Sequence, residues 1–229
     1  LAYSGRFGAD QVKSISLDGS PSKGATDAPI TIVEFADFEC PACRAASPLL
    51  DALVLKHPDL KLVFKNFPLD FHQNAEPAAR AAMAADKQGK FWEMHKELFS
   101  TPEPLTAEHI TALAKKVGLD LAKFDKDQRS EAVVDAVNRD KKQGREAQLK
   151  GTQSLFINSR EFNYATDFGG ELEQWLGLER ELLGARKLPD AAPAKQPTQT
   201  GEAEQVNPAA PAPVDDKKPK SEPGAPATP

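Results

Sequence analysis

Apolar and polar residues follow two different rhythms along this chain. The run Ile30–Phe35 is rich in β-branched residues and predicts a buried strand. Between residues 74 and 150, apolar residues instead recur every three or four positions, as in Ile110, Leu113 and Val117, which predicts helices. We interpret these helical stripes as core packed against the sheet rather than as a cofactor site.

Residues with special backbone preferences divide the helical stretch. Asn74 is suited to cap an Ala-rich first helix, and Gly89 to break it. Gly118 is suited to end a later helix, and Ser130 to start a further one. The stretch is therefore expected to hold several short helices.

The pattern stops near residue 185. Residues 185–229 hold 10 of the 19 Pro residues, no aromatic residue, and equal numbers of basic and acidic side chains. Such a segment cannot bury enough apolar surface to offset the entropy of ordering it. We therefore expect an N-terminal extension at 1–28, one domain at 29–184 and a disordered tail at 185–229.

Composition and net charge argue against some classes of function. The 229 residues carry a net charge of -5, and no uninterrupted apolar run approaches the roughly 20 residues that a transmembrane helix needs. The mild acidity argues against a nucleic-acid reader, whose phosphate contacts need a basic face. Proteins or small molecules are the expected partners.

The two cysteines of the chain, Cys40 and Cys43, stand as Cys-Pro-Ala-Cys directly after the predicted strand. Pro41 suits the first position of a helix, which places Cys40 at the helix N-terminus. Free backbone N–H groups and the helix dipole favour a thiolate there. We expect Cys40 to attack and Cys43, one turn further on, to resolve, without any cofactor.

Half of a zinc site and an inert core pair are the alternatives. Zinc needs about two further Cys or His ligands. The four histidines, His57, His72, His95 and His109, are not paired at metal-ligand spacing. We therefore favour redox chemistry, expect no metal, and interpret His95 as a packed core residue.

Several motifs together resemble the DsbA-like branch of the thioredoxin superfamily. They are the strand, the turn FECPAC, a helix containing Pro48, the stretch QGKFWEMHKELF at 88–99 and the stretch GTQSLFINSREF at 151–162. The resemblance implies an α/β fold, with a thioredoxin-like mixed sheet and a helical insertion at about 72–150. It also implies thiol-disulfide exchange with protein thiols or disulfides in an extracytoplasmic compartment, periplasmic or membrane-tethered, where a membrane redox partner is a candidate.

Glu34 matches the buried acid that this family places beneath its cysteines. On strand parity it shares a face with Ile30 and Ile32. A carboxylic acid in an apolar layer has a raised pKa, so Glu34 could accept the proton of Cys43 during exchange. An exposed carboxylate at a sheet edge is the alternative.

The resemblance implies that substrate contacts Pro41, Ala42 and the pair Thr152-Gln153. The family normally has a cis-proline where this chain has Gln153, so we expect a trans bond in a shifted loop or a locally strained backbone. Weakened peptide binding would follow. The alternatives are then a thioredoxin-fold binding or scaffold module with weak or no turnover, and a reductase for a small disulfide or peroxide.

The residues around the cysteines also bear on the redox potential. Ala42 offers the thiolate no positive charge, and Asp37 and Glu39 are expected to oppose it. A strongly oxidising protein needs a very stabilised thiolate. We therefore predict a less oxidising protein than family members with His between the cysteines.

Overall fold

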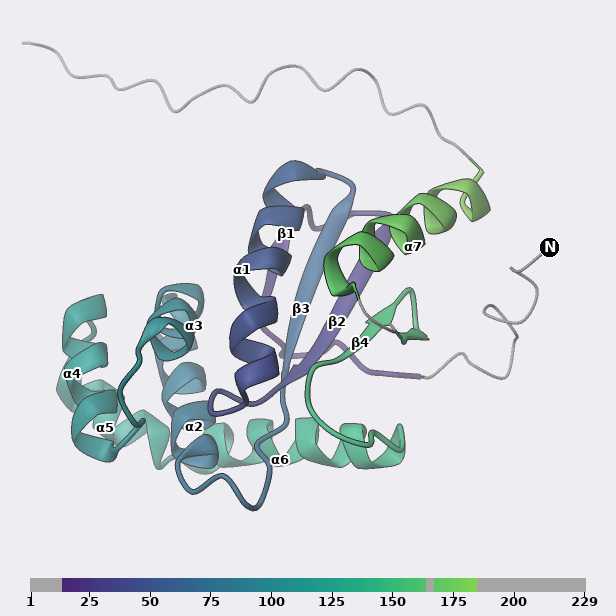
Figure 1. Ribbon diagram of the computed structural model, residues 1–229. Coiled ribbons are helices and arrows are strands. Elements are labelled where there is room, and N and C mark those ends of the chain that lie inside the picture. Colours follow the sequence, from purple (N-terminus) through teal and green to yellow (C-terminus); the bar gives the residue numbers. More distant parts are fainter. Residues whose placement is uncertain (1–13, 164–166, 185–229) are drawn as a thin grey trace, which may run out of the picture. The chain divides into compact units, whose positions relative to one another are not determined.

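The computed structural model describes residues 14–163 and 167–184. In this part of the chain a mixed sheet has the strand order β1-β3-β2-β4-β5 (Figure 1). β2 pairs parallel with β3, whereas the other neighbouring strands pair antiparallel. The strands are β1 (Ser22–Gly24), β2 (Ile30–Ala36), β3 (Leu60–Asn66), β4 (Ser154–Ile157) and β5 (Arg160–Phe162).

Helices account for most of the remaining described residues. They are α1 (Pro41–Lys56), α2 (Ala75–Asp86), α3 (Phe91–Ser100), α4 (Ala107–Val117), α5 (Leu121–Gln128), α6 (Glu131–Glu146) and α7 (Phe168–Leu182). The helical insertion consists of α2 to α6, and it lies within the residues predicted for it. The α/β class and the mixed sheet are thus confirmed. No helix in 14–163 or 167–184 is long and apolar enough to cross a membrane.

Both faces of the sheet are covered by apolar contacts. Ile32 lies on the face where Leu50 of α1 and Trp175 of α7 pack. Val33, on the opposite face, packs in a second cluster with Ala147, which follows α6. The alternation predicted for the first long strand is therefore confirmed.

The helical insertion has a core of its own. Met94, Leu98 and Ile110 are almost completely buried there, and Phe64 of β3 reaches the same cluster. The predicted stripes are thus core positions, as expected, but they pack against one another as much as against the sheet. In Figure 1, α2 to α5 lie together beside the sheet.

A buried ion pair joins the insertion to the sheet. Lys65 Nζ of β3 lies 3.1 Å from Asp140 Oδ1 of α6, and both side chains are buried. The backbone N–H of Asn66 donates to the other oxygen of Asp140 at 3.1 Å. Because all three groups are withdrawn from water, these contacts fix the carboxyl end of β3 against α6.

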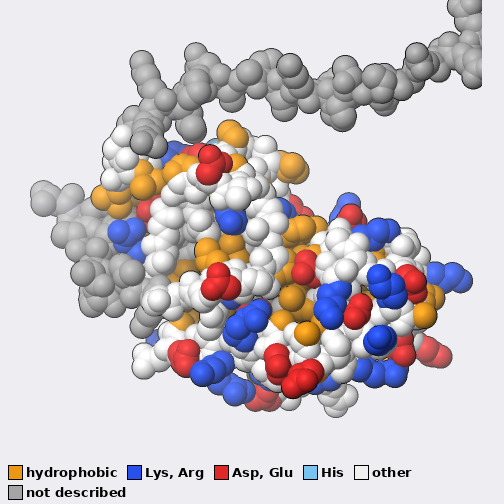
Figure 2. Space-filling model, turned by 180° about the vertical axis from the view of Figure 1, so that it is seen from behind, with side chains coloured by type: hydrophobic (Ala, Val, Ile, Leu, Met, Phe, Trp, Pro, Cys, Tyr) orange, Lys and Arg blue, Asp and Glu red, His pale blue; other side chains and the backbone are white. Residues whose placement is uncertain are grey.

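Charged side chains of both signs mix over the surface of the helical insertion, as Figure 2 shows from behind. A typical exposed pair is Lys116 with Glu97, whose Nζ and Oε2 atoms are 2.7 Å apart. Exposed pairs of this kind contribute up to about 1 kcal/mol. The fold therefore rests on the buried clusters rather than on surface charge.

Two predicted helix starts have the right position but different polar contacts. Asn74 precedes α2, yet its side chain makes no capping bond and donates to Glu39 instead. Ser130 precedes α6, and its hydroxyl donates to the carbonyl of Asp127. By contrast, Gly118 ends α4 with φ of 78°, the left-handed conformation that glycine adopts without strain.

Neither β3 nor α7 was predicted from the sequence, and strand β1 is a third element that the sequence pattern did not reveal. It lies within the segment assigned to an N-terminal extension, and it pairs with β3 through the register Lys23 with Leu62. A run of only three residues has too short a pattern to predict a strand. The tail predicted from residue 185 lies outside the described residues.

Candidate active site

The two cysteines lie where β2 leads into α1. Cys40 occupies the N-cap position and Pro41 begins the helix, as predicted. Both thiols are free, Cys40 is 9 % exposed, and Cys43 is completely buried. A partner can therefore approach Cys40 more readily than Cys43.

Hydrogen bonds favour an ionised Cys40. The pKa of Cys40 is lowered from 9.0 to about 5, chiefly because the Cys43 side chain hydrogen-bonds to its sulfur. The Thr152 side chain and the backbone N–H groups of Ala42 and Cys43 lower it further, and partial burial opposes them. The donors at the helix N-terminus thus act on Cys40 as the sequence predicted.

Cys43 is held in the opposite protonation state. Its pKa is raised well above 9.0 because it donates to Cys40 and because it is buried. The backbone of Asp37 hydrogen-bonds to the Cys43 sulfur and lowers this pKa, though by less. At neutral pH the pair therefore consists of a Cys40 thiolate and a Cys43 thiol.

Glu34 lies buried on β2, with no exposed surface. Burial raises its pKa from 4.5 to about 8, and the positive charge of Lys23 lowers it by less. Neither carboxylate oxygen has a hydrogen-bond partner among the described residues. The Glu34 charge also raises the pKa of Cys43, so the two groups lie close enough to interact electrostatically.

Lys23 is a site residue that the sequence analysis missed. Its Nζ pairs with Asp51 of α1 and lies 4.1 Å from the centre of the Trp92 ring. Burial lowers the Lys23 pKa to about 8, and the Glu34 charge raises it by less. Lys23 reaches the site through the pairing of β1 with β3, for which no local sequence signal exists.

The Thr152-Gln153 loop lies beside the cysteines, as the resemblance implied. The Thr152 side chain hydrogen-bonds to Cys40. Gln153 has φ of 62°, a left-handed conformation that costs a non-glycine residue free energy, and its N–H donates to the Phe35 carbonyl at 3.1 Å. This backbone is thus locally strained at φ, and proline cannot adopt it because its φ is fixed near -65°.

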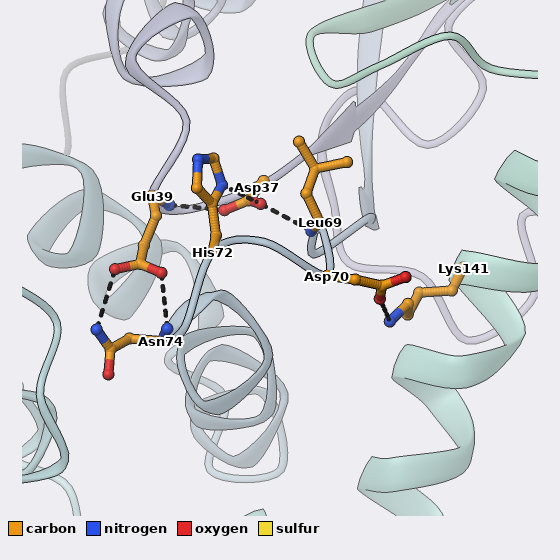
Figure 3. Close-up of polar contacts among 7 residues, drawn as sticks. All are labelled: Asp37, Glu39, Leu69, Asp70, His72, Asn74 and Lys141. Atoms are coloured by element: carbon orange, nitrogen blue, oxygen red, sulfur yellow. Dashed lines mark hydrogen bonds and ion pairs between the residues drawn. The ribbon is translucent and has the colours of Figure 1, made fainter.

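Asp37 and Glu39 were expected to oppose the Cys40 thiolate, and the structure corrects this. Their carboxylates turn toward the loop between β3 and α2 (Figure 3). Asp37 Oδ2 accepts from Leu69 N–H at 2.9 Å and from His72 Nδ1 at 2.7 Å. Glu39 Oε2 accepts from Asn74 N–H at 2.7 Å. Neither charge is among the causes that shift the Cys40 pKa.

The four histidines have separate environments. His95 is buried among aromatic rings, which lowers its pKa to about 3, as suits a neutral core residue. His57 contacts Glu173 at 3.2 Å, His109 contacts Thr101 at 2.8 Å, and His72 bonds to Asp37. Within the described ranges no group of three His, Cys, Asp or Glu side chains could hold a metal ion.

Known structures share this fold. A thioredoxin-like oxidoreductase from Silicibacter pomeroyi DSS-3 superposes with a TM-score of 0.66 and 26% identity, over 72% of this chain and 94% of that one. BdbD from Bacillus subtilis gives 0.65 and 24%, over 74% and 97%. The thiol-disulfide exchange protein alpha-DsbA2 from Wolbachia pipientis gives 0.64 and 24%, over 76% and 90%.

Curated relatives that match this chain are named as Na(+)/H(+) antiporters. A Na(+)/H(+) antiporter NhaA 1 from Mycolicibacterium vanbaalenii is 38% identical over 66% of this chain, and an NhaA 3 from Salinispora tropica is 33% identical over 66%. The matched stretch is 25% and 23% of their respective lengths. This chain thus matches about a quarter of the length of each protein that carries the antiporter name.

The model of one protein family, described as thioredoxin, matches residues 16–175. This match covers the sheet, the cysteine turn, the insertion and about the first half of α7. The chain therefore belongs to the thioredoxin family, and it has the fold of the family's DsbA-like thiol-disulfide oxidoreductases.

Proposed function

We propose that this protein is a thiol-disulfide oxidoreductase that exchanges a Cys40–Cys43 disulfide with protein thiols or disulfides. One observation carries the proposal: the Cys40 sulfur lies at the start of α1, within reach of the Cys43 thiol, the Thr152 side chain and two backbone N–H groups. These donors stabilise a thiolate, which is the nucleophile of disulfide exchange.

The exchange divides into two steps. The Cys40 thiolate attacks one sulfur of a partner disulfide, forms a mixed disulfide and expels the first partner thiolate. Cys43 then gives its proton to Glu34 and attacks the Cys40 sulfur, which expels the second partner thiolate. The dithiol loses two electrons and the partner disulfide gains them, and the reverse sequence oxidises a partner dithiol.

Glu34 suits the role of proton acceptor because its pKa of about 8 lies close to neutral pH. A carboxyl group of ordinary pKa would be a weaker base toward a thiol. Lys23 supports the charged form of Glu34 by its own charge. The proton transfer is proposed to take place through a water molecule, since the oxygens of Glu34 have no partner among the described groups.

Substrate is proposed to lie across Pro41, Ala42, Thr152 and Gln153, which flank the more accessible sulfur. A polypeptide could pair with the loop backbone in the manner of an added strand. The compartment is proposed to be extracytoplasmic, as for the DsbA-like proteins that this chain resembles, with a membrane protein as one candidate redox partner. The comparisons support the fold of such an enzyme, and the substrates remain part of the proposal.

The backbone of Gln153 favours a second candidate, a binding or scaffold module. Its left-handed φ differs from the conformation that a proline would give the loop, so the loop could bind a polypeptide without turnover. Exchange with oxidised glutathione separates the two functions. An oxidoreductase loses two thiols and passes the new disulfide to a reduced protein, whereas a scaffold binds that protein without exchange. Cys40→Ser, which removes only the nucleophile, is the control.

A further inference from the structure

Asp37 is a buried carboxylate that the proposed exchange does not use. It is 1 % exposed and lies three residues before Cys40. Its Oδ1 atom accepts from the N–H of Glu39 at 2.7 Å, and its Oδ2 atom accepts from Leu69 N–H at 2.9 Å and from His72 Nδ1 at 2.7 Å (Figure 3). Three donors on one buried carboxylate hold it in a single orientation.

The backbone of the same residue contacts both cysteines. The Asp37 carbonyl accepts from the N–H of Cys40 at 3.1 Å. The Asp37 backbone N–H donates to the Cys43 sulfur, which favours the ionised form of that thiol. The Asp37 side chain thus contacts the loop between β3 and α2, while its backbone carbonyl contacts Cys40 and its backbone N–H contacts Cys43.

The loop between β3 and α2 makes further polar contacts with its surroundings. Glu39 accepts from both the backbone and the side-chain nitrogen of Asn74, at 2.7 and 3.1 Å. Asp70, which is exposed, pairs with Lys141 of α6 at 3.0 Å in a contact that Figure 3 draws apart from those of Asp37 and Glu39. The loop can therefore act as a fixed support for the cysteine turn.

We propose that Asp37 is a positioning residue for the resolving step. Its carboxylate, anchored on Leu69 and His72, holds its own backbone N–H against the Cys43 sulfur, where negative charge develops when Cys43 attacks the mixed disulfide. This inference rests on the proposed function and concerns only its second step. The bonds formed and broken are those of ordinary exchange: Cys43 forms the bond to Cys40, and the partner leaves as a thiolate.

An aromatic disulfide, dithiobis(nitrobenzoate), separates the two steps because each step releases one equivalent of coloured nitrothiobenzoate. The first equivalent reports the attack by Cys40, and the second reports the attack by Cys43. In Asp37→Ala we expect the first rate to stay within about twofold of wild type and the second to fall about tenfold, a change of about 1.4 kcal/mol in barrier. Asp37→Asn keeps one acceptor oxygen and should give an intermediate second rate.

The matched control is Asp70→Asn, which removes a charge from the same loop but leaves the Asp37 contacts in place. It should release both equivalents at wild-type rates. If Asp37→Ala and Asp37→Asn leave the second rate unchanged, or slow both equivalents equally, Asp37 does not position the resolving thiol. If wild-type protein releases no equivalent faster than Cys40→Ser does, the proposed function itself fails, whatever the Asp37 variants do.

Discussion

Glu34 offers a sharp test because its burial affects both the proposed proton transfer and the pH dependence of the unfolding free energy. The group has a pKa of about 8 in the folded protein and an ordinary value of 4.5. Between these pH values the folded state retains a proton that the unfolded chain has released, so stability falls as pH rises through this window and levels off above about 8. The substitution Glu34→Gln removes the ionisable group, so the variant should not lose stability in this pH window.

The magnitude follows from the same two values. At about 1.4 kcal/mol per pKa unit, a rise from 4.5 to about 8 corresponds to a ceiling of about 5 kcal/mol at alkaline pH. Water penetration around a buried charge reduces such figures, so we expect Glu34→Gln to be more stable than wild type by about 2 to 5 kcal/mol near pH 9. Near pH 5 the two proteins should agree within about 1 kcal/mol, because this pH lies only about half a unit above the ordinary pKa of 4.5 and little of the loss has yet accumulated.

The assay is urea unfolding of the reduced protein, followed by the fluorescence of its two tryptophans, of which Trp175 is buried against the sheet. The same variant should slow the release of the second nitrothiobenzoate equivalent, since the resolving thiol has lost its proton acceptor. A stability difference that is the same at both pH values would refute the idea that Glu34 ionises in a buried site. A more stable variant with an unaltered second step would refute its role in proton transfer.

Changes at three further positions test other parts of the structure. Asp140→Ala leaves Lys65 buried without its partner and should lower the unfolding free energy by about 3 to 5 kcal/mol in urea; a loss below about 1 kcal/mol would contradict a dry ion pair. Gln153→Gly should raise stability by up to about 1 kcal/mol, whereas Gln153→Pro should lower it by about 3 kcal/mol, and the reverse order in thermal melts would contradict the left-handed backbone. Thr152→Val should raise the pH midpoint for alkylation of Cys40 while leaving it below 9.0; an unmoved midpoint would show that Thr152 does not stabilise the thiolate.

Local patterns were enough to predict the elements that carry the cysteines. The β-branched run of β2 and the proline after Cys40 are signals within a few residues, and the structure has the strand and the helix start where they were expected. Strand parity also placed Glu34 on the face that it shares with Ile30 and Ile32, because the alternation of side chains holds along any regular strand. These features depend on neighbours in sequence, which is why the sequence was sufficient.

Contacts between distant residues could not be predicted in this way. Lys23 reaches the site because β1 pairs with β3, about forty residues further along the chain. Charge alone suggested that Asp37 opposes the thiolate, whereas the hydrogen-bond donors at Leu69 and His72 turn its carboxylate away. The left-handed backbone of Gln153 likewise has no signature, since glutamine does not favour it.

Titration of the Cys40 thiol tests the account most directly. The ultraviolet absorbance of the thiolate, followed against pH in the reduced protein, should show a transition near pH 5 that is lost in Cys40→Ala. Such a transition means that the start of α1 holds an ionised nucleophile at neutral pH. A transition near the ordinary value of 9.0 would mean that the donors around Cys40 do not stabilise its thiolate, and the proposed exchange would lose its basis.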